Sequence, residues 1–301
     1  MVQETRSSTW TGTLSAVAAY CIWGLMPLYW RELTSAAPLE VLAHRIIWSF
    51  VFISLGLIVA GRFGETMRVM RRLVTAPSES GALILVLAAL FASANWLVHI
   101  VGVGSGRVVE LGFGMFLTPL ATVAIGVVVF SEKLTGLRLL AVGCAACGVG
   151  VLVAGLDRFP WIAILVSSTW AVYGALKKKV RIPAGESVAI EHALMTVPAL
   201  VLLAASPAGY AAHFAGGFES GLSLFLIGSG LVTSIPMVLF SLSAQRLPMT
   251  LLGIIQYINP VLTFALGVVV FDEPLGTAEK AATLLILAAV VLYAASTRQK
   301  V

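Results

Sequence analysis

The stretches "LGFGMFLTPLATVAIGVVVFSEKL", residues 111–134, and "LGIIQYINPVLTFALGVVVFDEPL", residues 252–275, align without a gap at a constant offset of 141. Twelve of the 24 aligned positions are identical. The shared positions include Pro119/Pro260, Gly126/Gly267 and Glu132/Glu273. Because one copy lies in each half of the chain, the repeat predicts that the two halves share one architecture.

The composition is typical of a protein that lies in a lipid bilayer. Hydrophobic residues make up 59% of the 301 residues and charged residues only 11%, whereas soluble domains carry about a quarter charged residues. A helix of about 20 apolar residues crosses a bilayer and satisfies its own backbone hydrogen bonds, which lipid cannot do. The sequence therefore predicts an all-α integral membrane protein.

Ten apolar segments are separated by charged or turn residues. They lie at about residues 12–30, 40–60, 81–103, 109–130, 136–155, 159–176, 188–205, 221–243, 250–271 and 277–295. The two copies of the repeat fall in the fourth and ninth segments. We therefore expect ten transmembrane helices in two units of five, residues 1–156 and 157–301.

The basic residues predict the orientation in the membrane. Lys and Arg favour cytoplasmic loops, and with the N-terminus inside, 14 of the 19 fall there. The remaining five are Arg31, Arg45, Arg107, Arg158 and Lys280. We expect both termini to be cytoplasmic. Of the basic stretches, "MRVMRRLV" at 67–74 is typical of an amphipathic helix on the inner leaflet and "KKKVR" at 177–181 of a topology anchor, so nucleic-acid binding is not expected.

Five is an odd number, so the second unit must enter the membrane in the opposite direction to the first. Inverted repeats of this kind recur in secondary transporters, whose substrate site lies near the bilayer midplane between the halves. The alternative is a duplication that was kept only for packing.

Four further stretches carry a family resemblance: "AAYCIWGLMPLYW" at 18–30, "LEVLAHRIIWS" at 39–49, "NWLVHI" at 95–100 and "LGIIQYINP" at 252–260. With them the chain resembles the RarD-type permeases, known as chloramphenicol-sensitivity proteins, of the EamA branch of the drug/metabolite transporter superfamily. The resemblance covers nearly the whole chain. It implies a ten-helix carrier of small metabolites in the bacterial inner membrane.

Two prolines at equivalent positions, Pro119 and Pro260, are predicted to break their helices. A proline removes one backbone hydrogen bond and frees a carbonyl one turn earlier. At Pro260 that carbonyl belongs to Gln256, and with Tyr257 and Asn259 it would line a polar cavity. An ordinary kink for helix packing is the alternative.

Ionisable side chains inside apolar segments indicate function by default. Near the outer face we expect Arg45 to pair with Glu110, and near the inner face Glu191 with Arg246, so that the two pairs alternate as gates. The alternative is that these side chains extend to lipid head groups. The gating candidates are His44, Arg45, Glu110, Glu191, His192 and Arg246.

Aromatic and polar side chains deeper in the segments could contact a flat organic substrate. The candidates are Tyr20, Trp23, Asn95, Trp96, His99 and Tyr173. His99 is also a candidate for proton coupling, because histidine titrates near physiological pH. A packed aromatic core and a hydrogen bond between helices are the alternatives.

The sequence lacks the motifs of several other functions. "CAAC" at 144–147 matches a C-x-x-C pattern but lies in a Gly/Ala-rich segment that favours close helix packing. We expect no metal and no cofactor. The predicted function is alternating-access transport, most simply export, of a small organic molecule with protons as the candidate coupling ion. A facilitative carrier without coupling and, remotely, a membrane enzyme are the alternatives, and monomer and homodimer both stay open.

Overall fold

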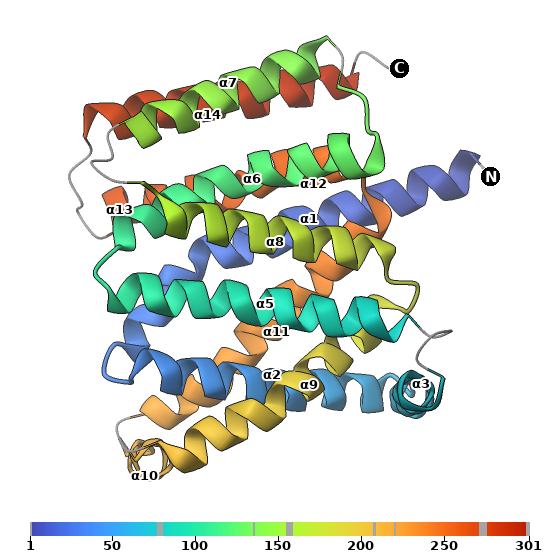
Figure 1. Ribbon diagram of the computed structural model, residues 1–301, viewed down its shortest axis with the longest axis vertical. Coiled ribbons are helices and arrows are strands. Elements are labelled where there is room, and N and C mark those ends of the chain that lie inside the picture. The colour runs from blue at the N-terminus through green and yellow to red at the C-terminus, as the bar shows by residue number, and fades with distance from the viewer. Residues whose placement is uncertain are drawn as a thin grey trace.

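The computed structural model describes residues 2–76, 81–134, 136–154, 159–206, 209–219, 221–270 and 276–298 (Figure 1). In this part of the chain every regular element is a helix. The first half contains α1 (Val2–Trp30), η1 (Arg31–Leu33), α2 (Pro38–Val59), α3 (Phe63–Thr75), α5 (Ala82–Gly104), α6 (Val108–Phe130) and α7 (Leu137–Ala154). The second contains α8 (Trp161–Lys179), α9 (Ala184–Ala205), α10 (Tyr210–Gly216), α11 (Leu222–Arg246), α12 (Met249–Gln256), α13 (Ile258–Val269) and α14 (Thr277–Arg298).

The long helices account for all ten predicted apolar segments, the ninth being divided between α12 and α13. Eight of the described helical segments are long and apolar enough to cross a membrane, with α12 and α13 counted as one. The other two are α8, which packs against α5 and α6, and α14, which packs against α7. The chain is therefore a multi-pass, all-helical membrane protein.

Apolar side chains cover the outside of the bundle as well as its interior. On α5, Leu83, Leu90 and Leu97 recur every seven residues and are 69%, 58% and 55% exposed. Spacing of seven places them on one face of the helix. In water such a stripe would be unfavourable, so this face is suited to lipid.

The basic stretch at 67–74 forms the amphipathic helix that its pattern predicts. In α3, Val69, Met70 and Leu73 pack against Leu85 and Ile190. The arginines of α3 are exposed: Arg68, Arg71 and Arg72. Figure 1 shows α3 end-on, running across one end of the long helices.

The two repeated prolines have different effects. α12 ends at Gln256 and α13 begins at Ile258, as expected if Pro260 cannot donate a hydrogen bond to the Gln256 carbonyl. The predicted break at Pro119 is wrong, because α6 continues through it. The carbonyl that Pro119 leaves without its helical donor is that of Met115, and the Thr118 hydroxyl donates to the neighbouring Gly114 carbonyl at 2.6 Å. Membrane helices tolerate proline in such positions.

Helices of the two halves contact each other in matched combinations. α2 packs on α9, α6 on α12, and α7 on α14. The contact of α1 with α11 is matched by that of α8 with α5, and the contact of α2 with α11 by that of α9 with α5. If each helix is replaced by its counterpart in the other half, the contact of α1 with α13 likewise corresponds to that of α8 with α6.

Candidate functional site

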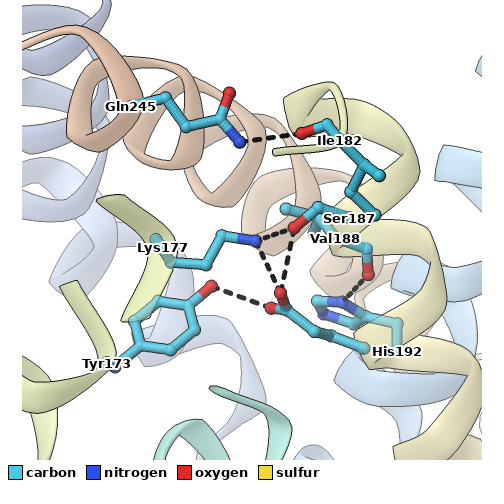
Figure 2. A network of polar contacts seen from close by, with 8 residues as sticks. Tyr173, Lys177, Ile182, Ser187, Val188, His192 and Gln245 are labelled. Carbon is cyan, nitrogen blue, oxygen red and sulfur yellow. Dashed lines mark hydrogen bonds and ion pairs between the residues drawn. The ribbon is translucent and has the colours of Figure 1, made fainter. Parts of the chain in front are cut away.

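A fully buried ion pair connects α8 and α9 near one end of the bundle (Figure 2). The Lys177 ammonium lies 2.5 Å from Oε1 of Glu191, and both side chains are 0% exposed. Lys177 also donates to the Ser187 hydroxyl, and the Ser187 hydroxyl donates to Oε1 of Glu191 at 3.1 Å. Tyr173 donates to the other carboxylate oxygen at 3.0 Å. Each charge therefore has several polar partners.

This network corrects the predicted pairing of Glu191 with Arg246. Arg246 is exposed at the end of α11, whereas Lys177, read from the sequence as part of a topology anchor, points inward. Spacing offered a signal for it, since Tyr173 and Lys177 lie four residues apart on α8, as do Ser187 and Glu191 on α9. Residues four apart share one face of a helix.

His192, the residue after Glu191, is also fully buried. Its Nδ1 lies 2.9 Å from the Val188 carbonyl, which can only accept, so Nδ1 carries the proton. In the neutral ring Nε2 then presents a lone pair, and Nε2 has no hydrogen-bond partner among the described residues. The ring lies 6.0 Å from that of Trp96.

The Trp96 ring also contacts Arg45 of α2. Its guanidinium carbon is 5.3 Å from the centroid of the Trp96 ring and 4.7 Å from that of Trp30. Nε donates to the Thr233 hydroxyl of α11 at 3.2 Å.

The predicted pairing of Arg45 with Glu110 is also wrong. Glu110 is buried and accepts from Nε of Arg107 at 2.6 Å. A side chain three residues earlier, one turn back on the same face, reaches the carboxylate without any movement between helices. Arg107 also stacks over Trp161 and donates to the Phe159 carbonyl, so it links α6 to the segment that leads into α8.

Three of the predicted aromatic residues meet in one cluster. Tyr20 lies 5.4 Å from Trp23, and Tyr173 stacks on Phe240 at 5.7 Å. Trp170, which the sequence analysis missed, joins the two pairs, with its ring 5.3 Å from that of Trp23 and 5.2 Å from that of Tyr173. Trp96 contacts Arg45 and His192 instead. These packed rings fit the alternative of an aromatic core, which the candidates also allowed.

Polar groups on α5 connect that helix to α8. The Asn95 amide donates to the Val166 carbonyl at 2.8 Å and to the Thr169 hydroxyl at 3.0 Å. Asn95 therefore makes an interhelical hydrogen bond. His99, one turn further along, is partly exposed.

The break between α12 and α13 places polar residues against the neighbouring helices. Gln256 is buried, and its side-chain carbonyl accepts from the Thr122 hydroxyl of α6 at 3.0 Å. Tyr257 is fully buried. Asn259 lies beside Gly24 of α1, where a Cβ would come within 3.2 Å of the Asn259 carbonyl oxygen.

Two buried carboxylates connect the halves at opposite ends of the long helices. Glu40, at the start of α2, lies 2.9 Å from Nδ1 of His213 in α10. Glu186, at the start of α9, lies 2.6 Å from Arg62, just before α3. The two glutamates are 1% exposed, whereas their partners are half-exposed. His44, one turn after Glu40, accepts from the Trp48 indole at 3.2 Å and stacks on Phe214 of α10 at 4.5 Å.

Glu132, one of the repeated residues, caps a helix of the other half. Its two carboxylate oxygens accept the backbone N–H groups of Met249 and Thr250, each at 2.8 Å. These are unpaired donors in the first turn of α12. A Cβ on Gly126 would lie 3.0 Å from the same carboxylate, so the glycine gives it room. The repeat counterpart, Glu273, lies outside the described residues.

A cavity of about 700 Å³ opens beside the end of α8. Its lining consists of Gly81, Ile84, Leu85, Lys178, Lys179, Val180, Arg181 and Ile182. The residues predicted as site candidates are absent from this described lining. The cavity therefore presents cationic groups at the same end of the bundle as the Lys177–Glu191 pair.

Comparison with known proteins identifies the family. Residues 160–295 match the EamA-like transporter family. Protein RarD of Streptomyces exfoliatus is 38% identical over 94% of this chain and 87% of its own length. An uncharacterized transporter of Bacillus subtilis (strain 168), YojE, is 34% identical over 95% of this chain and 94% of its own length.

The chain belongs to the RarD-type EamA transporters. A solved crystal structure with 18% identity has the same fold, with a TM-score of 0.70 over 93% of this chain and 96% of that one. As a RarD-type EamA transporter, the protein is a membrane transporter of small substrates.

Proposed function

We propose that this RarD-type protein is a secondary carrier that works by alternating access between two inverted five-helix halves, residues 1–156 and 157–301. Ten helices cross the membrane, with both termini in the cytoplasm of a bacterial cell. The cargo is a small organic molecule, and the direction is outward. The two halves exchange conformations, and each exchange closes one side and opens the other.

The correspondence between α2 and α9 carries this proposal. Both helices have 22 residues. Counted from their first residues, Glu40 and Glu186 are both third, and Arg45 and Glu191 are both eighth. Together with the matched helix contacts and the repeat at 111–134 and 252–275, this supports two copies of one unit.

The two buried glutamates supply the gates. With the N-terminus inside, the Glu40–His213 pair lies at the outer end and the Glu186–Arg62 pair at the inner end. The first pair joins the start of α2 to α10, the segment after α9. The second pair joins the start of α9 to the segment after α2. Both pairs are formed in this structure, so transport requires each to open in turn.

Proton coupling would use groups beside the inner gate. Glu191 and His192 are adjacent, titratable and fully buried. Protonation of Glu191 would release its ion pair with Lys177 and weaken the contact of α8 with α9. Transport that is independent of a proton gradient would instead identify a facilitative carrier.

Accessibility labelling tests the inverted arrangement. In a cysteine-free background, we expect Lys133→Cys to react with an impermeant maleimide only from the cytoplasm and Lys280→Cys only from outside. Both native lysines are exposed. Labelling of both from the same side would contradict the inverted halves.

Crosslinking tests the gates in the same background, with purified protein in sealed vesicles. A short bifunctional thiol reagent across Glu40→Cys/His213→Cys, or across Arg62→Cys/Glu186→Cys, is expected to stop counterflow of tracer. The four single-cysteine variants treated with the same reagent are the controls. Full counterflow by completely crosslinked protein would rule out that pair as a gate.

A further inference from the structure

Arg45 is a cation inside the bundle for which the described residues supply no carboxylate. Its hydrogen bond goes to the neutral Thr233 hydroxyl, and its other contacts are the indole rings of Trp30 and Trp96. A guanidinium has five N–H donors, so this leaves four of them for other partners. An indole face attracts a cation but does not neutralise it.

Arg45 is partly buried, and its lack of an acidic partner among the described residues contrasts with the buried carboxylates, each of which has a basic partner. Glu191 has Lys177, and Glu110 has Arg107. Glu40 and Glu186 have His213 and Arg62. An unpaired charge within the membrane is costly, and such residues mark substrate or ion pathways.

A second polar group without a hydrogen-bond partner among the described residues belongs to His192, whose ring also contacts Trp96. The Nε2 lone pair of His192 is fully buried and accepts no hydrogen bond from the described residues. The Trp96 ring lies 6.0 Å from the His192 ring and 5.3 Å from the Arg45 guanidinium carbon. The Trp96 ring thus contacts both a cationic donor, Arg45, and an acceptor, Nε2 of His192.

We propose that Arg45 is the anion-binding group of the substrate site and that the cargo is a planar organic carboxylate. The carboxylate binds two N–H groups of Arg45, the geometry to which a guanidinium is suited. The flat part of the cargo lies along Trp96, and an N–H or O–H group on it donates to Nε2 of His192. This inference rests on the proposed carrier function and specifies its substrate class.

A pair of matched probes tests the charge requirement. Indole-3-acetate has a carboxylate, a flat ring and an N–H donor, and indole-3-acetamide is its neutral counterpart. With purified full-length protein in detergent, we expect the acid to raise the melting temperature and the amide to leave it unchanged. Equal stabilisation by both, or no stabilisation by the acid, would overturn the proposal.

Variants of Arg45 locate the effect. Arg45→Gln is expected to weaken binding of the acid by about ten- to a hundredfold, the loss of a charge-assisted hydrogen bond. Arg45→Lys keeps the charge without the two-pronged geometry and should lie between Gln and the native residue. Arg31→Gln is the control, because Arg31 is exposed and its guanidinium bonds the neighbouring side chain of Glu32 at 3.2 Å. Undiminished binding by a folded Arg45→Gln or Arg45→Lys variant would overturn the assignment.

Counterflow in proteoliposomes separates this inference from the carrier function. We expect labelled indole-3-acetate to exchange against unlabelled acid in the native protein and not in Arg45→Gln. Binding of the acid without exchange would contradict the carrier function and leave the Arg45 site in place. Counterflow of indole-3-acetamide without binding of the acid would support the carrier function and contradict the Arg45 site.

Discussion

Arg45 and Glu191 are each the eighth residue of a 22-residue helix, and the two helices, α2 and α9, pack against each other. Equivalent positions in the two halves thus carry opposite charges. Glu191 is neutralised within the protein by Lys177. Arg45 has no such partner among the described residues, and this difference underlies the proposal that Arg45 binds the cargo.

Removing one charge of the Lys177–Glu191 pair should destabilise the protein strongly. We expect Lys177→Met or Glu191→Gln to lower the free energy of unfolding by about 3–5 kcal/mol, because the remaining group is left buried without its partner. The double variant Lys177→Met/Glu191→Leu should recover much of the loss. Thermal unfolding in detergent measures all three.

The neighbouring Lys179 provides the control for that series. It is exposed and contacts the Phe130 ring from 5.8 Å. Lys179→Met should change the unfolding free energy by less than about 1 kcal/mol. A loss in Lys177→Met no larger than this would show that the buried pair contributes little.

Glu132 should hold the start of α12 in place. In Glu132→Ala, the N–H groups of Met249 and Thr250 lose their acceptor, and we expect a loss of about 1–2 kcal/mol, as for other helix caps. Hydrogen exchange should become faster at these two amides and stay unchanged at the buried centre of α11.

Glu65→Ala is the matched control for the helix cap, because Glu65 is an exposed glutamate in the first turn of α3. It should leave exchange in α12 unaffected. Unchanged protection of Met249 and Thr250 in Glu132→Ala would contradict the capping role.

Gly230 should be the point of closest approach between α2 and α11. A Cβ there would lie 2.3 Å from the Trp48 carbonyl carbon and 2.5 Å from the Ser49 nitrogen, and backbone atoms cannot move aside cheaply. Gly230→Ala should therefore cost about 1–3 kcal/mol or more. Thermal unfolding and the yield of folded protein measure the effect.

Gly56 of α2 offers the opposite case, because a Cβ there meets no atom within 4 Å. Gly56→Ala should be neutral or stabilising by about 0.5–1 kcal/mol, since alanine favours the helix. If the two alanine variants had the same stability, the helices would not approach as closely as the structure shows.

The sequence predicted the helices well, because the length of an apolar run is a local property. The ten segments and the amphipathic helix at 67–74 all coincide with helices. The exception is Pro119, where α6 stays continuous. A missing backbone donor can be read from the sequence, but whether the helix breaks there depends on the three-dimensional arrangement.

The charge partners could not be predicted in the same way. Glu110 has a partner one turn away, Arg107, and Glu191 has one on the preceding helix, Lys177. The predicted partners, Arg45 and Arg246, lie on other helices of the same halves. Lys177 lies in a run of three lysines, and its buried contacts with Ser187 and Glu191 of α9 distinguish it from its neighbours. The pattern shows which residues are ionisable, whereas the fold decides which of them meet.

One stretch of sequence, written twice, has two shapes in this protein. Its first copy forms α6, a continuous rod, and its second is jointed at Tyr257 between α12 and α13. A rod can only tilt as a whole, whereas a jointed helix can bend in the middle. In the proposed carrier, the half with the jointed helix can bend where the other half can only tilt, so the two steps of the transport cycle would differ in geometry.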